Sequence, residues 1–254
     1  MLHKKKFGQH FLIDQNIINK LVNYINPTKE DSIIEIGPGD GALTKSIISK
    51  VDSMCLIEKD SDLVDELLFI TNNYKKSKVI NNDVLKFDFS NSKDSIRVIG
   101  NLPYNISTEI IFKMCNVKNL IDMHFMLQKE VVDRMTSNSN TKIYGRLSVM
   151  TQAYFITKKL FDISEHVFMP KPKVKSSFIR LLPRVSIFNN KKHENMFYNV
   201  VKSAFEGRRK MIRTSLKKYL TIKDFSALDI KPELRAENLM VKDYLLISNY
   251  VDKN

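Results

Sequence analysis

Short apolar runs alternate with stretches of helical periodicity from the N-terminus to Pro183. The runs that predict strands are Ser32–Ile36, Ser53–Glu58, Lys78–Asn82, Ile96–Gly100 and Met123–Gln128, with two more within Phe155–Ser164 and Ser177–Leu182. The stretches that predict helices are Gln15–Ile25, Ala42–Lys50, Asp62–Thr71, Ser107–Cys115 and Arg146–Tyr154. This alternation predicts an α/β fold, in which a mostly parallel sheet is covered by helices.

The pattern changes towards the C-terminus. The last two expected strands are joined by Glu165–Ser176, a short link with two prolines and no helical periodicity, so we expect an antiparallel hairpin at the sheet edge. From His193 onward the pattern is helical, with apolar residues at Val201, Ala204, Phe205, Ile212, Leu216 and Leu220. We therefore expect two domains, residues 1–185 with the sheet and an all-helical domain over residues 186–254.

Composition limits the function classes. The 254 residues are 43% hydrophobic and 27% charged, which excludes wholesale disorder. No apolar stretch is long enough for a membrane span or a signal peptide, and Cys55 and Cys115 fit neither a disulfide framework nor a metal-binding pattern. We expect a cytoplasmic protein that needs no metal and no membrane, and nothing in the sequence suggests more than a monomer.

The charge is positive and uneven. Lys and Arg total 41 against 28 Asp and Glu, a net charge of +13, and residues 184–254 hold 15 basic and 8 acidic side chains. A polyanionic partner, most simply nucleic acid, explains this excess. A lysine-rich proteome would explain it equally well, so composition alone leaves both interpretations open.

A glycine-rich turn follows the first expected strand, at Gly37-Pro38-Gly39-Asp40-Gly41. Its spacing lacks the dinucleotide fingerprint GxGxxG, which favours a smaller nucleoside ligand over a pyrophosphate. No Walker-type lysine follows, so ATP hydrolysis is not expected. Glu58 ends the second strand, where a carboxylate can accept hydrogen bonds from ribose hydroxyls, and Asp83 follows the third, where it can accept one from an exocyclic amine. The sequence therefore predicts a nucleoside site at the carboxyl edge of the sheet.

The fourth expected strand ends in Asn101-Leu102-Pro103-Tyr104. Pro103 fixes its own φ and keeps Leu102 out of the α region, which can aim the Leu102 carbonyl and the Asn101 amide oxygen at one point. Two such acceptors suit an exocyclic amine, and Tyr104 can stack on the ring that carries it. The N6 amine of adenine is a poor nucleophile because its lone pair is delocalised into the ring. Two hydrogen bonds from its N–H groups would make the nitrogen a better nucleophile. Attack on a sulfonium methyl needs positioning more than a general base.

Several runs that stand out together are Lys6–Leu12, Glu35–Gly41, Asn101–Tyr104, Met123–Val131, Tyr144–Val149 and Phe168–Val174. They resemble motifs of the bacterial small-subunit (16S) ribosomal RNA adenine N6,N6-dimethyltransferases, the family whose loss gives kasugamycin resistance. The resemblance covers the chain from Lys6 to about Leu220. It implies a Rossmann-like, seven-stranded methyltransferase sheet with a small helical C-terminal domain, and S-adenosylmethionine as the cofactor.

The resemblance also implies an activity and a set of site residues. The enzyme would dimethylate N6 of two adjacent adenosines near the 3′ end of 16S ribosomal RNA in an immature small subunit, with a role in ribosome biogenesis. The implied cofactor-binding residues are Gln9, His10, Leu12, Gly37, Gly39, Glu58, Lys59, Asp83, Val84 and Asn101. The implied catalytic residues, which would engage the target adenine, are Asn101, Leu102, Pro103, Tyr104 and Phe168.

The sequence departs from the family pattern at three positions. His10 stands where the family usually has Asn, Lys175 where an acidic residue is common, and Met169 replaces a small polar residue. The first departure puts the cofactor contact of that side chain in doubt, and none of the three falls on the proposed chemistry.

The segment Phe205–Lys218 holds six basic residues and one acid. On a helix, Arg209, Arg213 and Lys217 would form one row able to contact phosphates, although such runs usually form a solvated face. The expected RNA-binding residues are Lys4, Lys5, Lys6, Lys171, Lys173, Arg208, Arg209, Lys210, Arg213 and Lys217.

Three other functions fit less well. A 23S ribosomal RNA adenine methyltransferase of the macrolide-resistance type has the same chemistry, but Asn105–Thr108 and Tyr144–Ser148 fit the small-subunit family better. A ribosome-assembly factor that binds RNA without catalysis would not need the intact glycine loop and Asn101–Tyr104. A small-molecule methyltransferase would leave the charge of +13 unexplained.

Overall fold

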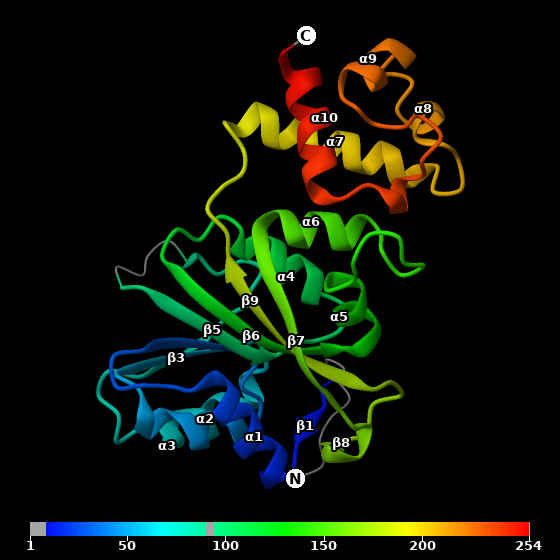
Figure 1. The fold of residues 1–254 in the computed structure, drawn as a ribbon. Helices are drawn as coiled ribbons and strands as arrows, with labels where there is room; N and C mark the ends of the chain where they lie inside the picture. The colour runs from blue at the N-terminus through cyan, green and yellow to red at the C-terminus, as the bar shows by residue number, and fades with distance from the viewer. Residues whose placement is uncertain (1–8, 90–93, 254) are drawn as a thin grey trace. The chain divides into compact units, whose positions relative to one another are not determined.

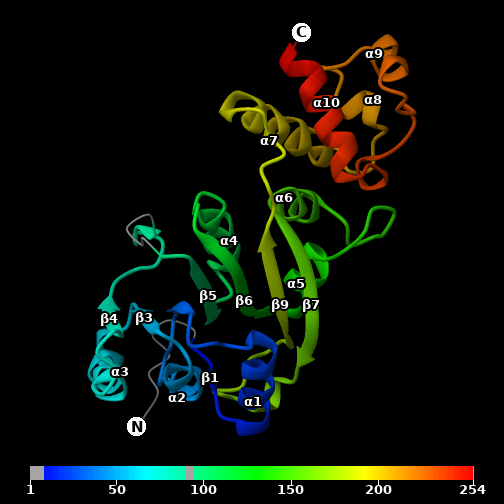
Figure 2. The ribbon, with the colours of Figure 1, turned by 60° about the vertical axis from the view of Figure 1, so that its left-hand side comes forward.

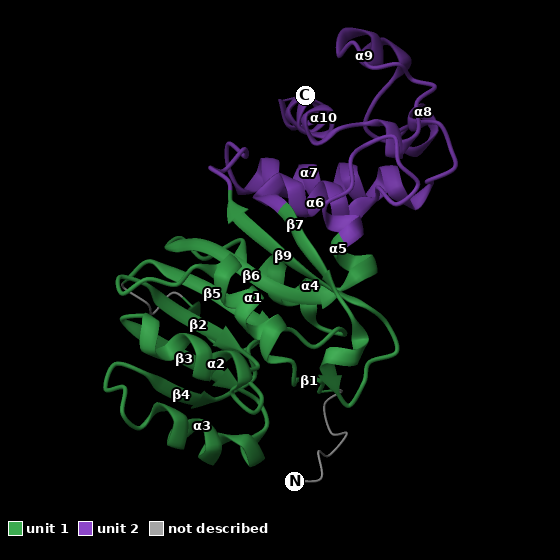
Figure 3. Cartoon of the chain, turned by 60° about the horizontal axis from the view of Figure 1, so that its bottom comes forward, with its two compact units in different colours: residues 1–132, 158–183 green, residues 133–157, 184–254 purple. Residues whose placement is uncertain are grey.

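The computed structural model describes residues 9–89 and 94–253, and the chain forms two compact units (Figure 3). Unit 1 comprises Met1–Val132 and Lys158–Pro183, and unit 2 comprises Asp133–Thr157 and Arg184–Asn254. The expected division after residue 185 therefore differs from the observed one, because α6 (Arg146–Tyr154) packs against helices α7 and α10 of the C-terminal segment. Over the described residues, no helix combines the length and the apolar character that a membrane crossing requires.

A seven-stranded sheet forms the centre of unit 1, in the order β4-β3-β2-β5-β6-β9-β7 (Figures 1 and 2). The strands are β2 (Ser32–Ile36), β3 (Ser53–Glu58), β4 (Lys78–Asn81), β5 (Ile96–Asn101), β6 (Leu120–Gln128), β7 (Phe155–Ile163) and β9 (Ser176–Pro183). The pairs from β4 to β6 are parallel and β9 runs antiparallel to β6. The predicted α/β sheet is confirmed, with β7 and β9 as neighbours at its edge.

The remaining elements of unit 1 connect or cover these strands. They are the strands β1 (Phe11–Leu12) and β8 (Phe168–Met169), the α-helices α1 (Gln15–Ile25), α2 (Ala42–Ile47), α3 (Val64–Thr71) and α4 (Ser107–Met114), and the 3-10 turns η1 (Ile48–Lys50), η2 (Ser61–Leu63) and η4 (Glu165–Val167). Helix α5 (Lys129–Met135), which the sequence pattern did not predict, begins in unit 1 and ends in unit 2.

Helix α1 shows how local sequence sets these boundaries. Asp14 caps its N-terminus by accepting hydrogen bonds from the amides of Asn16 and Ile17, and Asn26 ends it in the left-handed conformation. Its apolar side chains Ile18, Leu21, Val22 and Ile25 are all buried. They share one core with residues of α2, β2 and β3, which places these helices on one face of the sheet.

Both faces of the sheet are covered. On β2, Ile33 belongs to the core shared with α1, whereas its neighbour Ile34 points to the other face and is also buried. Val98 of β5 and Phe125 of β6 are fully buried as well. Continuous apolar strands of this kind are typical of a parallel sheet between two layers of helices.

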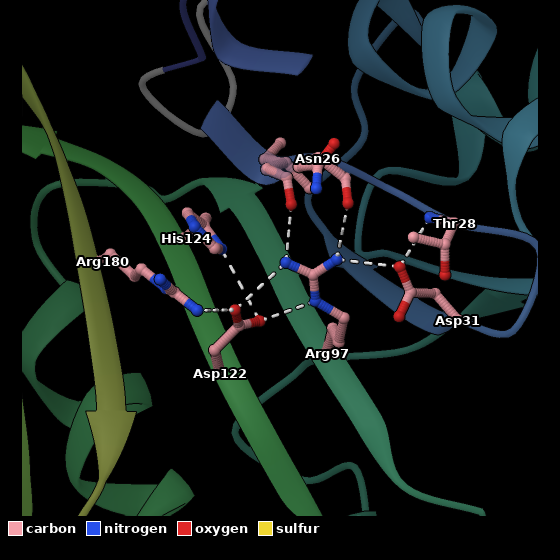
Figure 4. Close-up of polar contacts among 8 residues, drawn as sticks. Asn26, Thr28, Asp31, Arg97, Asp122, His124 and Arg180 are labelled. Atoms are coloured by element: carbon pink, nitrogen blue, oxygen red, sulfur yellow. Dashed lines mark hydrogen bonds and ion pairs between the residues drawn. The ribbon is translucent and has the colours of Figure 1, made fainter. Parts of the chain in front are cut away.

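A buried charged cluster links three strands of unit 1 to the end of α1 (Figure 4). Asp122 of β6 accepts two hydrogen bonds from Arg97 of β5, at 2.9 and 3.1 Å, and one from Arg180 of β9 at 3.1 Å. Arg97 also donates to Asp31 at 2.8 Å and to the Ile25 carbonyl at the end of α1 at 2.6 Å. The guanidinium therefore neutralises the buried carboxylate and satisfies a carbonyl at the helix C-terminus.

In the residues the structure describes, unit 2 is mostly helical, and it also includes the first three residues of β7. Besides α6 it contains α7 (Lys191–Glu206), α8 (Ile212–Ser215), α9 (Ile222–Ala227), α10 (Val241–Lys253) and the 3-10 turn η5 (Ala236–Asn238). Phe197 and Val201 of α7 and Tyr244 and Ile247 of α10 are fully buried and form its core. The Tyr244 hydroxyl donates to the Ala236 carbonyl at 2.6 Å, so this buried polar group is satisfied.

The expected basic helix over residues 205–218 is interrupted, which corrects the sequence interpretation. Helix α7 ends at Glu206, a turn follows at Gly207, and the next helix, α8, has only four residues. Arg209 lies in the turn and Lys217 beyond α8, so these residues and Arg213 do not form a single helical row. The apolar half of the prediction holds, since Ile212 and Leu216 are fully buried.

Candidate active site

One cavity of unit 1 collects the expected cofactor residues. It lies at the carboxyl ends of β2, β3 and β5, where open α/β sheets bind ligands. Its lining includes every expected cofactor residue, namely Gln9, His10, Leu12, Gly37, Gly39, Glu58, Lys59, Asp83, Val84 and Asn101. Of the expected catalytic residues, Leu102, Pro103 and Tyr104 line the same cavity. The structure therefore brings two separately inferred sets of residues to one place.

The glycine-rich turn forms one wall of the cavity. Gly37, Gly39 and Gly41 have φ values of 64°, 62° and 75°, a region that residues with a Cβ rarely adopt. A Cβ on Gly39 would also lie 3.1 Å from the Phe11 ring. Glycine is therefore required here both by the backbone conformation and by the close approach of the N-terminal segment.

Two buried carboxyl groups stand behind this turn. Glu58, 4% exposed, accepts hydrogen bonds from the backbone amides of Gly39 at 3.1 Å and Asp60 at 2.8 Å. Glu35, 2% exposed, accepts a bond of 2.6 Å from the Thr44 hydroxyl. Burial raises the pKa of both groups, and that of Glu35 reaches about 7 because Glu58 also repels its charged form.

Glu35 belongs to the motif Glu35–Gly41 that the sequence assigned to the cofactor site, but its side chain was given no contact of its own. The available signal was its position, because it is an acid within the apolar strand Ser32–Ile36, directly before the glycine turn. An ionisable group kept in a dry interior at the wall of a cavity, beside a second acid, is characteristic of a binding or catalytic site.

Asp83 differs from the other acids because it has a cation beside it. Its carboxylate lies 2.8 Å from the Lys59 ammonium and also accepts a hydrogen bond from the Leu85 amide at 3.0 Å. The Lys59 hydrogen bond, followed by the Leu85 amide, lowers the pKa of Asp83. Asp83 is therefore a fixed, charged acceptor at the edge of the cavity.

The segment after β5 supplies the remaining wall. The Asn101 side-chain amide donates to the His10 carbonyl at 2.8 Å, which leaves its oxygen as the acceptor end. The Leu102 amide donates to the Met126 carbonyl at 3.2 Å, and the Tyr104 hydroxyl is 2.8 Å from the Ser176 hydroxyl. Burial raises the Tyr104 pKa, so its hydroxyl stays neutral. Each group that could meet a substrate is held by a neighbouring element.

The N-terminal segment closes the cavity by pairing with a distant strand. Phe11 and Leu12 of β1 pair with Met169 and Phe168 of β8. His10, which replaces the usual Asn, lines the cavity, and its Nδ1 is 2.6 Å from the Pro170 carbonyl. The side chain therefore anchors this segment to the β8 loop.

Phe168 lies elsewhere than the sequence interpretation required. Its side chain is 2% exposed, belongs to the hydrophobic core of unit 1 and is absent from the cavity lining. Pairing with Leu12 turns it inward, so in this structure it offers no second stacking face for a base.

The expected RNA-binding residues of unit 1 have different environments. Lys4, Lys5 and Lys6 lie outside the described residues. Lys171 is 3.6 Å from the Glu165 carboxylate, whereas Lys173 is exposed on the β8 loop.

In unit 2, the expected RNA-binding residues are mostly at the surface. Arg209, Lys210, Arg213 and Lys217 are exposed. Arg208 is also exposed but donates to the Glu237 carboxylate at 3.0 Å and to the Lys142 carbonyl, so part of its role is structural.

These residues fit S-adenosylmethionine. A nucleoside requires acceptors for its hydroxyl and amine groups, which Glu58 and Asp83 can supply at successive strand ends. A sulfonium and an ammonium group are positively charged, and the buried carboxyls of Glu35 and Glu58 favour positive charge in the cavity. The glycine turn lets backbone groups approach such a ligand closely.

Comparisons with known proteins identify the family of the chain. A family model described as "Ribosomal RNA adenine dimethylase" matches residues 1–253. "Ribosomal RNA small subunit methyltransferase A" of Nitrosomonas eutropha is 45% identical over 252 residues, covering 98% of this chain and 97% of the relative. The protein of the same name from Coxiella burnetii is 44% identical, with 98% of each chain covered.

Two solved structures share the fold. A dimethyladenosine transferase from Plasmodium falciparum has a TM-score of 0.82 and 24% identity, covering 94% of this chain and 96% of that one. The 23S rRNA methyltransferase ErmE has a TM-score of 0.77 and 20% identity, covering 95% and 99%. The family match confirms the resemblance inferred from the motifs, together with the predicted methyltransferase fold and the use of S-adenosylmethionine. The chain belongs to the ribosomal RNA adenine dimethylase family.

Proposed function

We propose that the protein transfers methyl groups from S-adenosylmethionine to N6 of two adjacent adenosines near the 3′ end of 16S ribosomal RNA, two methyls to each. The observation that carries this proposal is the meeting of the acidic nucleoside site and Asn101–Tyr104 in one cavity. Relatives that cover nearly the whole chain and are named for the small ribosomal subunit support the choice of 16S over 23S RNA.

The chain's own residues would hold the cofactor in a defined orientation. Glu58 would accept hydrogen bonds from the ribose hydroxyls, and Asp83 would accept one from the adenine amine. The turn at Gly37 would contact the methionine part. When bound, the cofactor supplies an electrophilic sulfonium methyl group. The paired segment around Leu12 would exclude water from one side, which strengthens every electrostatic interaction inside the cavity.

Asn101 and Leu102 would orient the nucleophile. Because the Asn101 amide nitrogen donates to the His10 carbonyl, its oxygen is available to accept from one N–H of adenine N6, and the Leu102 carbonyl would accept from the other. Two such bonds favour a pyramidal nitrogen whose lone pair points at the methyl group. This positioning replaces a general base, since the product ammonium readily loses its proton to water.

Tyr104 would hold the target base. Its hydroxyl is tied to Ser176, which fixes the plane of the ring on the wall of the cavity. A flipped adenine stacked on this ring would regain part of the few kcal/mol lost on unstacking from RNA. The hydroxyl bond to Ser176 also means that the ring acts through its face and not as an acid.

The substrate would be an immature small subunit, in the cytoplasm, bound by a monomer of this protein. The positive charge of the chain supports an RNA partner, because exposed lysines and arginines bind phosphates without reading sequence. A role in ribosome biogenesis follows from a substrate that is only partly assembled, and loss of the modification would change sensitivity to kasugamycin.

Mass spectrometry of ribosomal RNA tests this proposal. Immature small subunits and, separately, 23S RNA are incubated with the protein and isotopically labelled S-adenosylmethionine, and the RNA is then digested. We expect two dimethyladenosines in a single fragment of 16S RNA. Label only in 23S RNA would favour the macrolide-resistance type of enzyme, and tight RNA binding without label would favour an assembly factor.

Asn101→Ala tests the amine-orienting role in the same assay. We expect methyl transfer to fall at least a hundredfold, because the orienting bond acts in the transition state. The matched control is Asn73→Ala, an exposed asparagine of unit 1, which should leave the rate unchanged. Full activity of Asn101→Ala, with a normal melting temperature, would refute the role.

A further inference from the structure

Unit 2 carries an exposed arginine–tyrosine pair that the proposed chemistry does not use. The Arg146 guanidinium lies over the Tyr198 ring, 4.9 Å from its centroid, and also donates a hydrogen bond of 2.7 Å to the Tyr198 hydroxyl. Arg146 begins α6 and Tyr198 lies on α7, so the pair joins two helices of one unit. Both side chains are exposed, Tyr198 to 40%.

Helix stability does not explain Arg146. It is the first residue of α6, where the positive end of the helix dipole disfavours a cation. A surface arginine gains little from an exposed neighbour, and 40% of the Tyr198 side chain remains in contact with solvent. The two side chains are therefore better explained by a ligand than by the fold.

The neighbouring positions on α7 extend the same chemistry. Asn195 and Lys202 are exposed and lie three and four residues from Tyr198 along the helix, so they share its face. Lys202 has a weak contact of 4.0 Å with Glu206, which leaves its ammonium accessible. This face thus offers an aromatic ring, a guanidinium plane, an amide and an ammonium.

The unit that carries this face is the more basic of the two. Unit 2 has 18 basic and 9 acidic side chains in its 96 residues, a net charge of +9, whereas unit 1 has a net charge of +4 in 158 residues. Stacked planar groups surrounded by positive charge are typical of surfaces that bind single-stranded nucleic acid, because every base has a face for stacking and every nucleotide a phosphate.

We propose that Arg146 and Tyr198, with Asn195 and Lys202, bind an unpaired nucleotide of the substrate RNA at a site separate from the methylation cavity. The base stacks on the Arg146–Tyr198 pair, and the remaining guanidinium donors and Lys202 contact phosphate. This inference rests on the proposed function, since it takes the RNA substrate as given. It adds a second contact that holds the RNA while the target adenine enters the cavity.

RNA affinity of matched variants tests the site. We expect Tyr198→Ala and Arg146→Ala each to weaken binding of a 16S RNA fragment about tenfold, the usual loss when one stacked base loses its platform. Tyr198→Phe keeps the ring and should bind almost normally. Arg146→Lys keeps the charge but not the plane and should lose affinity. Tyr24→Ala removes a tyrosine of similar exposure from α1 in unit 1 and should have no effect.

Further measurements separate binding from folding and from the proposed function. We expect S-adenosylmethionine affinity and kcat to stay normal in the variants while KM for RNA rises. If Tyr198→Ala and Arg146→Ala lower the melting temperature but bind RNA normally, the pair is a structural link between α6 and α7 and the inference is wrong. If these variants are normal in every assay, the inference is wrong while the proposed function stands. A wild-type protein that neither binds nor methylates RNA would overturn both.

Discussion

Two buried carboxyl groups in the sheet of unit 1 show opposite behaviour. Asp122 and Glu35 are 1% and 2% exposed, so burial disfavours the charged form of both carboxyl groups. Asp122 accepts hydrogen bonds from Arg97 and Arg180, which outweigh the effect of burial and lower its pKa. Glu35 accepts from the neutral Thr44 hydroxyl and is repelled by Glu58, so its pKa rises to about 7.

The difference separates structure from function. The charges around Asp122 are balanced within the protein, and the cluster joins β5, β6 and β9 to the end of α1 (Figure 4). Glu35 and Glu58 line the cavity, and their negative charges are not balanced within the protein in this way. Carboxyl groups kept in a dry cavity at a cost in stability indicate that their positive partner is a ligand.

The largest effect is expected at the balanced cluster. Asp122→Asn removes the carboxylate that Arg97 and Arg180 share and leaves Arg97 with Asp31, and breaking a buried pair in this way should lower the free energy of unfolding by about 3 kcal/mol. Urea denaturation measures the loss. The matched control is Asp52→Asn at an exposed ion pair with Lys76, where less than about 1 kcal/mol is expected. Equal losses in the free energy of unfolding for the two variants would show that the buried cluster stabilises the protein no more than the exposed ion pair.

The second effect is a dependence of stability on pH. His124 lies 3.7 Å from Asp122 but is buried, and burial, with the charges of Arg97 and Arg180, lowers its pKa to about 4. Between pH 6.5 and pH 4 the unfolded chain binds a proton at this histidine that the folded chain does not. Stability therefore falls as the pH falls through this window, by about 2 kcal/mol from pH 7 to pH 4.5.

His124→Phe should remove this contribution. Urea denaturation at pH 7 and pH 4.5 gives the difference for each protein, so any constant effect of the substitution cancels. We expect a smaller difference in the variant than in the wild type. The same pH dependence in both proteins would show that His124 is not buried in its neutral form.

The smallest effect on stability is expected at Glu35 in the cavity, where the substitution should stabilise the protein instead of destabilising it. Because the folded pKa of Glu35 is raised from 4.5 to about 7, its ionisation destabilises the folded protein as the pH rises through this range. Glu35→Gln should therefore stabilise the free protein by about 1 kcal/mol at pH 8, after the weaker bond to Thr44 is counted. A lower melting temperature at pH 8 would contradict this prediction.

Much of this fold was predictable because its signals are local. Strands β2 and β3 and helices α1 and α6 have the bounds that the apolar pattern predicted. Buried parallel strands are short apolar runs, and α1 has an Asp14 cap and an amphipathic face that can be identified without tertiary context. The interruption after α7 was missed because the apolar positions continue with helical spacing through Ile212 and Leu216, although Gly207 marks the break.

The site was predictable from the topology of the sheet and not from local signals. Its residues are far apart in the chain, but they follow strand ends, and parallel topology brings strand ends to one edge of the sheet. Phe168 follows β7 only after the turn Glu165–Val167, and its orientation depends on pairing with Leu12, which the pattern did not reveal. The raised pKa of Glu35 depends on burial and then on repulsion by Glu58, a neighbour across the sheet, so it required the structure.

The central claim is that the charges of the buried Glu35 and Glu58 carboxyl groups are unbalanced because a cationic cofactor completes them. Calorimetric titration with S-adenosylmethionine near pH 7, in buffers of different ionisation enthalpy, measures binding and proton release together. A cation in the cavity lowers the Glu35 pKa, so we expect binding with release of a fraction of a proton in the wild type, and weaker binding without that release in Glu35→Gln. Equal proton release in both proteins, or no binding by the wild type, would contradict the claim.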